Sequence, residues 1–577
     1  GNLLLRGKST GETADESNGI VATGGFTLNA GVSGDVSLIG EGGGTSVNSA
    51  GVYLGIGADQ TDDSVIRTKN GSITLAGSST GGSTEGNRGI LLVGGNASGK
   101  MTIEALGSGS LSLDGAGLAE AGNNPDYPQD IFFGKGVDVL ANAGAITITG
   151  SGTGQILINN AGTTIGYKAG TSVTSSSSQV EITEDTIAWG SGASLSINTS
   201  GTVAIKPYGD DFSVALSTSD IVFSSDVTGL TIGKSATSAD GTDDAAVTLG
   251  AATIAGPITV YSGDLAINAA LTATSSTINL HATGAVTQLA AMTATGLGLH
   301  GTGNFTLTNA SNAIGTLAGG NSSTKLATLS FVNAGALEIG TINPTGVTTT
   351  GDVFIATVNG DLTVAEDIVT GSSSASALIL VAGVSASAGG DGTPLSGNIL
   401  IDSTTGTPSL QVDTGGTIGL FSGDVAGSTG LTALVGSGSG NFRYNTSINA
   451  SGTVTAGYST TLATDVINAI YREQPSVTGT INSEQITYGD TLPTFSLSGG
   501  TDPVNGDSVT VAIASPSYST SNNLEAGSYT VSQTNLAGLG YSVGSINDGT
   551  LTVNTKALDL NYTGQNKVYD GNATATV

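Results

Sequence analysis

The segment GNLLLRGKSTGETADESNGIVATGG at Gly1–Gly25 aligns without a gap with GSITLAGSSTGGSTEGNRGILLVGG at Gly71–Gly95. Halfway between them lies a related strand-like segment, GDVSLIG at Gly34–Gly40, and further copies begin at Gly109 (GSLSLDG) and Gly144 (GAITITG). The repeat period is therefore about 35 residues, which is typical of solenoids and propellers. This period, more than any single motif, decides the fold.

Each repeat contains three short strand-like segments joined by turns. In the repeat that begins at Gly71 they are Ser72–Ala76, Ile90–Val93 and Met101–Ala105. Apolar and small polar residues alternate within them, so one set of side chains faces inward and the other faces solvent. Three strands and three turns per repeat predict one coil of an all-β, right-handed parallel β-helix. A propeller blade would instead need four antiparallel strands with hairpin turns.

The repeat becomes shorter further along the chain. Ile278-Asn-Leu280-His281 recurs as Leu297-Gly-Leu299-His300, 19 residues later. With coils of 19 to 35 residues, positions 1–440 hold about 13 to 20 coils, and at about 4.8 Å per coil they form a rod roughly 60–100 Å long. His281 and His300 then occupy one row of the stack. Without a Cys or an adjoining carboxylate pair, these histidines favour a repeat row over a metal site.

Composition supports a repeat protein and excludes several function classes. The chain has 577 residues, of which 91 are Gly and none is Cys, and its net charge is −30. Phosphate neutralisation needs basic stripes, which this acidic chain lacks, so nucleic-acid binding is excluded. No apolar run approaches the roughly 20 residues of a membrane-spanning helix. Because the chain opens on a strand-like segment and ends inside a motif, we expect it to be an internal part of a longer polypeptide.

The sequence pattern changes near residue 440, where Tyr and Pro become more frequent. We expect a β-helix stalk at 1–440 and a closing segment or linker at 441–474. A small β-rich module of five or six short strands follows at 475–555, and a further repeat begins at 556–577 and is truncated.

Several motifs resemble those of one family of proteins. The stretches LSFVNAGALEIGTI at Leu329–Ile342 and GDLTV at Gly360–Val364, with FRYN at Phe442 and IYREQP at Ile470, are similar to the stalk repeats and stalk end of filamentous-haemagglutinin-like adhesins. The module from residue 475, with TYGDTLP and AGSYTV, resembles MBG-type repeats, and KVYDGNATATV at Lys567–Val577 resembles the start of a YDG-type repeat. The resemblance implies two-partner secretion through an outer-membrane pore, display on a bacterial cell surface, and a role in cell adhesion and biofilms.

Two acidic clusters share a D-x-T-D-D pattern that suits a hard cation. Oxygen-rich turns of Asp, Gly and Thr can hold calcium, which takes 6–8 oxygen ligands. The alternative is that both clusters are solvated turns of the stalk, and no other cofactor is expected. The candidate calcium ligands are Asp59, Asp62, Asp63, Asp240, Asp243 and Asp244.

Aromatic residues in predicted loops are candidates for glycan contacts, because aromatic faces stack on sugars at binding sites. Tyr127 lies in the loop NNPDYPQDIFFGKG at Asn123–Gly136, while Trp189 and Tyr208 are isolated aromatics elsewhere. Alignment places Ile131–Phe133 on the second strand of its coil, so one of its two Phe residues is expected in the core.

The sequence predicts an extracellular structural and adhesive protein, without catalytic residues, that attaches cells to other cells or to surfaces. Its expected partners are cell-surface or matrix glycans or proteins, and the chains could also self-associate. One alternative is a β-helix protein that binds or cleaves polysaccharide, since such folds also house lyases and hydrolases, but those need clustered carboxylates beside a groove. A second alternative is a self-assembling extracellular filament or sheath protein.

Overall fold

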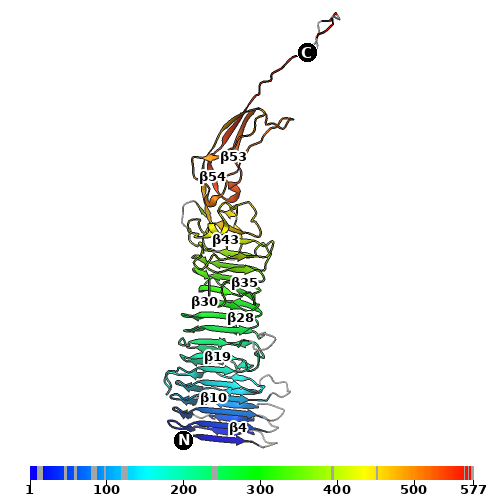
Figure 1. The fold of residues 1–577 in the computed structure, drawn as a ribbon. Coiled ribbons are helices and arrows are strands. Elements are labelled where there is room, and N and C mark those ends of the chain that lie inside the picture. The colour runs from blue at the N-terminus through cyan, green and yellow to red at the C-terminus, as the bar shows by residue number, and fades with distance from the viewer. Residues whose placement is uncertain are drawn as a thin grey trace.

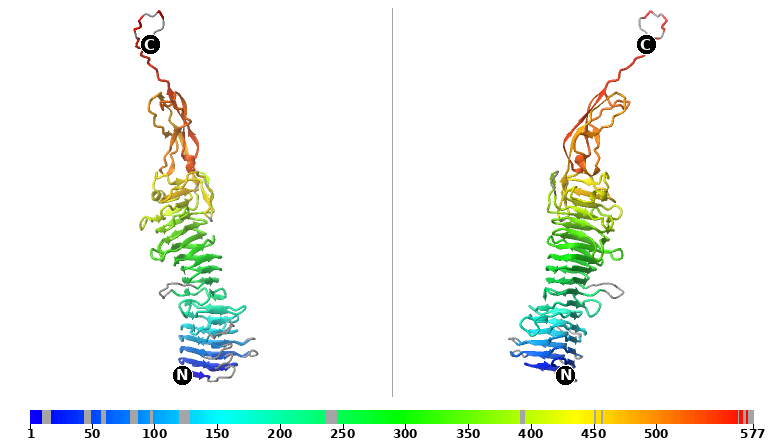
Figure 2. Two further views of the ribbon diagram at one scale, coloured as in Figure 1. Left: turned by 90° about the vertical axis from the view of Figure 1, so that its right-hand side faces the viewer. Right: turned by 60° about the vertical axis from the view of Figure 1, so that its left-hand side comes forward.

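The computed structural model is a long rod of stacked coils with a small module at its C-terminal end (Figures 1 and 2). It describes residues 1–9, 17–43, 49–56, 61–79, 87–95, 99–118, 128–235, 245–390, 395–449, 452–455, 457–564, 566–568 and 571–572. The strands of the rod pair in parallel over many coils. The predicted fold class, an all-β parallel β-helix, is confirmed.

Each coil in the first part of the rod contributes one strand to each of three sheets. In one coil, β7 (Ile73–Ser79), β8 (Arg88–Val93) and β9 (Met101–Ala105) belong to sheets that we number 1, 2 and 3. Among the described residues, sheet 1 has 20 strands, sheet 2 six and sheet 3 seven. Sheet 4, with 11 strands, takes over the position of sheet 2 from β20 (Leu216–Ser217) onward.

The strands of one sheet come from successive coils. Sheet 1 begins with β1 (Leu3–Lys8), β4 (Val36–Gly42), β7, β10 (Leu111–Ala116), β13 (Ile146–Gly150), β16 (Val180–Thr183) and β19 (Thr202–Lys206). Sheet 2 contains β2 (Ile20–Thr23), β5 (Ala50–Gly55), β8, β11 (Gln129–Phe133), β14 (Ile156–Ile158) and β17 (Ile187–Trp189). Sheet 4 includes β31 (Asn304–Leu307), β33 (Thr328–Asn333), β36 (Val353–Thr357), β39 (Leu378–Val381) and β43 (Ile418–Ser422).

Strand register follows the repeat seen in the sequence. Leu5 pairs with Leu38, which in turn pairs with Leu75, so the 70-residue offset between the two aligned segments spans two coils. In the later, shorter coils Ile278 of β28 (Thr277–Ala282) pairs with Leu297 of β30 (Met292–His300), as the 19-residue repeat predicts. Phe133 is buried and Phe132 is half-buried, so one of these two Phe residues is in the core.

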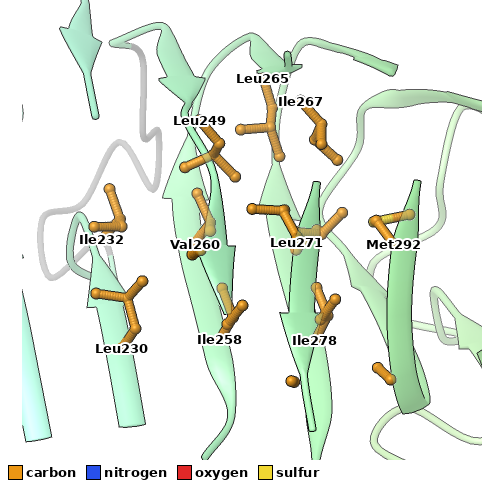
Figure 3. Close-up of a cluster of buried hydrophobic side chains, with 14 of the residues drawn as sticks. Leu230, Ile232, Leu249, Ile258, Val260, Leu265, Ile267, Leu271, Ile278 and Met292 are labelled. Carbon is orange, nitrogen blue, oxygen red and sulfur yellow. The ribbon is translucent and has the colours of Figure 1, made fainter. Parts of the chain in front are cut away.

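The interior of the rod is filled by aliphatic side chains stacked in rows. Figure 3 shows such rows from successive coils, including the neighbours Leu230, Ile258 and Ile278 and the parallel row of Ile232 and Val260. Each of these side chains is almost completely buried. Full burial of one aliphatic side chain is worth about 1.5–3 kcal/mol. The rows belong to one cluster of contacting buried side chains, the main core, which runs from Ala30 to Tyr541.

A column of glycines allows two sheets to approach closely at one corner of the coil. Gly7, Gly40, Gly77, Gly115 and Gly150 pair with one another along sheet 1. At the first four positions a Cβ atom would overlap a carbonyl oxygen at the start of the next strand, and for Gly77 this oxygen belongs to Gly89. Only glycine fits there, which is why these glycines recur at the repeat period.

The rod ends in a helix and two strands. After β43 come the short helix α1 (Leu431–Val435), then β44 (Phe442–Arg443) and β47 (Ile467–Tyr471). Both strands join sheet 4, in which β47 pairs in parallel with β43. The last rung of the rod therefore lies within residues 441–474. Between them the hairpin of β45 (Ser447–Ile448) and β46 (Val454–Thr455) lies outside the main core.

The C-terminal module consists of two small sheets. One contains β49 (Ser476–Ile481), β51 (Leu497–Ser498) and β54 (Ser542–Asn547), and the other contains β50 (Glu484–Thr487), β52 (Val511–Ile513), β53 (Gly527–Gln533) and β55 (Gly549–Asn554). A turn of helix, α2 (Leu536–Leu539), precedes β54. Residues 555–564 form no helix or strand. Across the described residues, no helix is both long and apolar enough to cross a membrane.

The glycine column leads to a prediction about stability. In the variant Gly77→Ala the new methyl group meets the Gly89 carbonyl, so we expect a loss of about 1–3 kcal/mol or more in the free energy of unfolding. Gly335→Ala is the matched control, because a Cβ at this exposed glycine meets no atom within 4 Å. The control should change stability by no more than about 0.5 kcal/mol. Urea unfolding followed by circular dichroism measures the free energy of unfolding of both variants. Equal losses in the two variants would contradict the role of the glycine column in close packing.

Candidate functional site at the junction of rod and module

The segment IYREQP connects the last rung of the rod to the module. Its first two residues end β47, where Ala469 and Tyr471 point into the main core and Ile470 points to the opposite face. There Ile470 joins a second core with Val332, Ala356, Val381, Phe421 and Ile448. Strand alternation therefore fixes both faces of the last rung before the chain leaves the rod.

Arg472 is the largest fully buried side chain in the described part of the protein. Its guanidinium donates hydrogen bonds to the carbonyl oxygens of Ala382 (2.6 Å), Ser396 (2.7 Å) and Gly397 (2.6 Å). Burial lowers its pKa to about 10, with Asp424 acting in the opposite direction, so the side chain stays charged at neutral pH. The planar fork of one arginine thus ties together loops that come from earlier coils.

Neighbouring side chains complete the closure of the rod. Asp424 accepts hydrogen bonds from the backbone N–H groups of Leu395 (2.8 Å) and Gly427 (2.6 Å). Glu473 accepts one from the N–H of Val425 (2.8 Å). These carboxylates satisfy backbone donors that the end of a solenoid would otherwise leave unpaired.

A cluster of tyrosines around Asp507 joins the rod to the module. Tyr444, which follows β44, and Tyr541, which precedes β54, each donate a hydroxyl hydrogen bond of 2.9 Å to Asp507 Oδ2. The Tyr444 ring centroid lies 5.7 Å from that of Tyr471 and 4.4 Å from that of Tyr541. Asn505 donates to the Tyr444 hydroxyl at 3.0 Å. Because these rings belong to the main core, rod and module share one hydrophobic interior.

Burial dominates the electrostatics of this junction. It raises the pKa of Asp507, against the two tyrosine hydroxyls that favour its ionised form. It also raises the pKa of Tyr444, so that this phenol stays a hydrogen-bond donor at physiological pH. Arg443, which is also buried, donates to the carbonyl oxygens of Gly440 and Phe442 (both 2.8 Å) and Thr461 (3.0 Å). The junction is thus a fixed set of donors and acceptors and differs from a solvated linker.

A buried pair of carboxyl groups lies inside the rod, far from the junction. Asp130 on β11 accepts hydrogen bonds from the N–H groups of Gly117 (2.7 Å), Gly152 (2.8 Å) and Gly154 (3.1 Å). Glu184, which follows β16, lies beside it, and both residues are buried. Burial, with Asp130 as the neighbouring charge, raises the pKa of Glu184 to about 9. Burial raises the pKa of Asp130 as well, but its three amide donors favour ionisation, so the shared proton resides on Glu184.

A column of stacked rings follows three coils of sheet 1. Tyr261 of β25 (Ile258–Ser262), His281 and His300 are register neighbours, and their ring centroids are 4.4 Å and 4.1 Å apart. The two histidines therefore occupy one row, as the repeat predicts. Burial lowers the pKa of His281 to about 4, with His300 contributing, and burial also lowers the pKa of His300. Both rings are neutral at pH 7 and serve as a stacking column.

The structure describes only some of the candidate ligand residues predicted from the sequence. Asp62 and Asp63 lie before β6 (Ser64–Thr68), where Asp63 accepts a hydrogen bond from the Lys100 N–H at 2.8 Å. Within the described ranges, no group of three or more His, Asp or Glu side chains is arranged to hold a metal ion. The calcium ligands therefore stay a prediction. The predicted residues outside the described ranges are Asp59, Asp240, Asp243, Asp244 and Tyr127.

The two other candidate aromatics occupy different environments. Tyr208 lies after β19 and is 51% exposed, so its ring is accessible. Trp189 is half-buried and packs against the main core, because it pairs in register with the inward-facing Ile158. A glycan contact stays a prediction for both residues, and the accessible ring is that of Tyr208.

Sequence reasoning missed the residues that form the junction and the carboxyl pair. Arg472 and Tyr471 belong to a motif that the sequence did reveal, but nothing in IYREQP indicates that the arginine is buried. Asp130 lies within PQDIFF, where aromatic composition alone attracted notice. A carboxylate placed on an otherwise apolar strand is the signal that could have identified it.

The carboxyl pair predicts how stability depends on pH. Glu184 has a folded pKa near 9 against an ordinary value of 4.5, so the folded state retains a proton that the unfolded state releases between these values. Stability from this group is complete below pH 4.5 and is lost as pH rises towards 9. Glu184→Gln keeps a donor to Asp130 and removes the titration, so its melting temperature should exceed that of the wild type at pH 8. This difference in melting temperature between the variant and the wild type should be smaller at pH 5, because less of the wild-type stability from Glu184 is lost there.

Glu181→Gln is the matched control for this measurement. Glu181 lies three residues away and pairs with Lys206 at 3.0 Å on the surface. Differential scanning fluorimetry from pH 5 to 9 should therefore give the control a pH profile parallel to that of the wild type. If Glu184→Gln also ran parallel to the wild type, the shared proton would be disproved.

Arg472 predicts a local loss of structure at the rod end. Arg472→Met leaves three buried carbonyls without a donor, so we expect a cost of about 3 kcal/mol or more. Hydrogen-exchange mass spectrometry should show faster exchange at residues 382–390 and 395–398. Arg6→Met, at an exposed arginine on β1, should leave exchange in these segments unchanged. Unaltered protection in Arg472→Met would refute the closing role of the arginine.

Comparison of this chain with protein-family models, with curated proteins and with solved structures finds no match in any of the three. A functional assignment therefore rests on the geometry of the rod, its junction and its outer faces.

Proposed function

We propose that this chain is the stalk of a large, surface-displayed bacterial adhesin, which holds binding modules away from the cell for attachment to other cells or surfaces. The observation that carries the proposal is the continuity of the main core from Ala30 to Tyr541. A single interior links the stacked coils, the closing rung and the base of the module. Such a body suits reach and the transmission of force.

The mode of stacking supports this role. A single coil cannot bury its inward side chains, so coils stabilise one another and length is gained by adding coils. The contacts at the junction then determine whether a module at the end of the rod has a fixed orientation or is connected only by a flexible linker. Tyr444 and Asp507 hold it through buried contacts, and Gln474 and Ser542 continue the hydrogen bonding into the module.

The charge of the chain supports a rod whose copies stay dispersed. A net charge of −30 produces repulsion between neighbouring copies at low ionic strength and favours solubility. We propose cell-surface or matrix glycans or proteins as partners, and export through an outer-membrane pore as the family resemblance implies. The role contains no catalytic step.

Coil deletion tests the stalk. Because Ile258, Ile278 and Leu297 are register neighbours, deleting residues 258–296 removes two coils and keeps every strand in phase. We expect a folded rod that is shorter by about 10 Å, at about 4.8 Å per coil. The out-of-phase deletion of residues 258–287 should lose cooperative unfolding. Negative-stain electron microscopy measures the rod length of both variants, and thermal melts measure the cooperativity of their unfolding. Equally cooperative unfolding of the two variants would contradict the requirement that coils stack in phase.

Adhesion itself is tested with beads that carry the full chain. Coated beads should attach to cells or to extracellular matrix more strongly than beads coated with an unrelated acidic protein. Attachment no stronger than that control, or turnover of any polysaccharide by the chain, would overturn the proposed function.

A further inference from the structure

The outer face of sheet 4 is partly covered by residues of the closing segment at 441–474. The part of this face next to the covered area is open. Outward-facing Val332, Ala356, Val381 and Phe421 pair with one another across β33, β36, β39 and β43, and they are buried in the second core. The residues that cover them, including Tyr458 and Leu462, follow β45.

The next outward row, two residues earlier on each strand, lines an open groove. Ser330 pairs with Phe354, which pairs with Ile379, and all three side chains are half-buried. They line a hollow of about 440 Å³ together with Thr308 and Gly452. The floor is thus a phenyl ring and an aliphatic side chain on a rigid sheet.

Gly452 forms the rim of the groove beside the phenyl ring. Its φ is +77°, and a Cβ there would have the Phe354 ring edge as its nearest neighbour, at 3.5 Å. The positive φ and the missing side chain leave the edge of the ring uncovered at this point.

The other wall of the groove is a carboxylate held in place by serines. Asp352 Oδ1 accepts hydrogen bonds from the hydroxyls of Ser372 and Ser374 (2.8 Å for the latter), and Oδ2 accepts one from Ser376 at 3.1 Å. Each carboxylate oxygen can accept two hydrogen bonds, so Oδ2 retains one acceptor position. Because Ser376 is exposed, its hydroxyl and the Asp352 carboxylate meet solvent at the groove.

An apolar ring face beside a pre-oriented carboxylate and hydroxyl groups matches the two sides of a sugar. The C–H face of a pyranose packs on an aromatic ring, and its hydroxyls donate to carboxylate oxygens. The acidic wall and the net charge of −30 disfavour an anionic sugar. We propose that this groove binds a neutral hexose unit of a surface glycan. The inference rests on the proposed adhesive function and names one ligand class for it.

Binding is tested on the full chain with an array of neutral and sialylated oligosaccharides, followed by titration calorimetry with the best neutral hit. Phe354→Ala removes the stacking face, and Thr308→Trp fills the groove from an exposed position. We expect each variant to weaken binding at least ten-fold while the melting temperature of Thr308→Trp stays that of the wild type. Tyr518→Ala, which removes an exposed aromatic of the C-terminal module, is the matched control and should bind normally, and Tyr208→Ala tests the competing aromatic on the rod.

The outcomes separate this inference from the proposed function. No binding to any neutral oligosaccharide, a preference for sialylated ones, or loss of binding only in Tyr208→Ala would overturn the groove proposal. If beads coated with the chain still attach to cells in these cases, the adhesive function stands without the groove. If the beads fail to attach while neutral glycan binding is lost in Phe354→Ala, the groove proposal stands and the adhesive function fails.

Discussion

The structure depends on burial between successive coils. An inward side chain such as Ile278 is covered above and below by Ile258 and Leu297, and neither neighbour belongs to its own coil. One coil alone would expose its aliphatic rows and its unpaired backbone groups, so the free energy of folding accrues only as coils stack. The recurring glycines serve this constraint, because Gly77 and its column partners let the strands of one coil approach closely enough to keep the rows in line.

A rod built in this way must be closed where the stacking stops. The described end of the rod is closed by buried polar groups, which cost desolvation energy unless every donor and acceptor is satisfied. The two terminal nitrogens of Arg472 donate to three carbonyl oxygens, and Asp507 Oδ2 accepts from two tyrosine hydroxyls. The closure is therefore specific in geometry, and it orients the module that follows.

The fold could be predicted from the sequence because its cause is local and periodic. Alternation in Ile73-Thr74-Leu75 and the recurrence of glycine at about 35 residues both follow from the geometry of one coil. The closing contacts are neither local nor periodic: the Arg472 guanidinium reaches the carbonyl of Ala382, 90 residues earlier. Among the predicted ligand residues, Trp189 shows that the sequence does not reveal how far a side chain is buried. Its aromatic ring suggested a glycan contact, which stays a prediction, and the register with Ile158 that half-buries the ring came only from the structure.

The groove on sheet 4 escaped sequence analysis for a related reason. Phe354 and Asp352 are two residues apart, but the serines that orient the carboxylate and the glycine that leaves the ring edge open come from other segments. A coil-to-coil repeat fixes which side chains face outward, and insertions between coils decide which of these are covered.

Two titrating features inside the rod oppose each other in their dependence on pH. The raised pKa of Glu184 favours the folded state as pH falls from 9 towards 4.5. The lowered pKa of His281 acts in the other direction, because the unfolded state binds a proton below pH 6.5 that the folded state accepts only near pH 4. Between pH 4.5 and 6.5 the two contributions therefore offset each other. Because both groups lie in one continuous stack, their opposite slopes reduce the pH dependence that either group alone would give to the stability of the rod in this range.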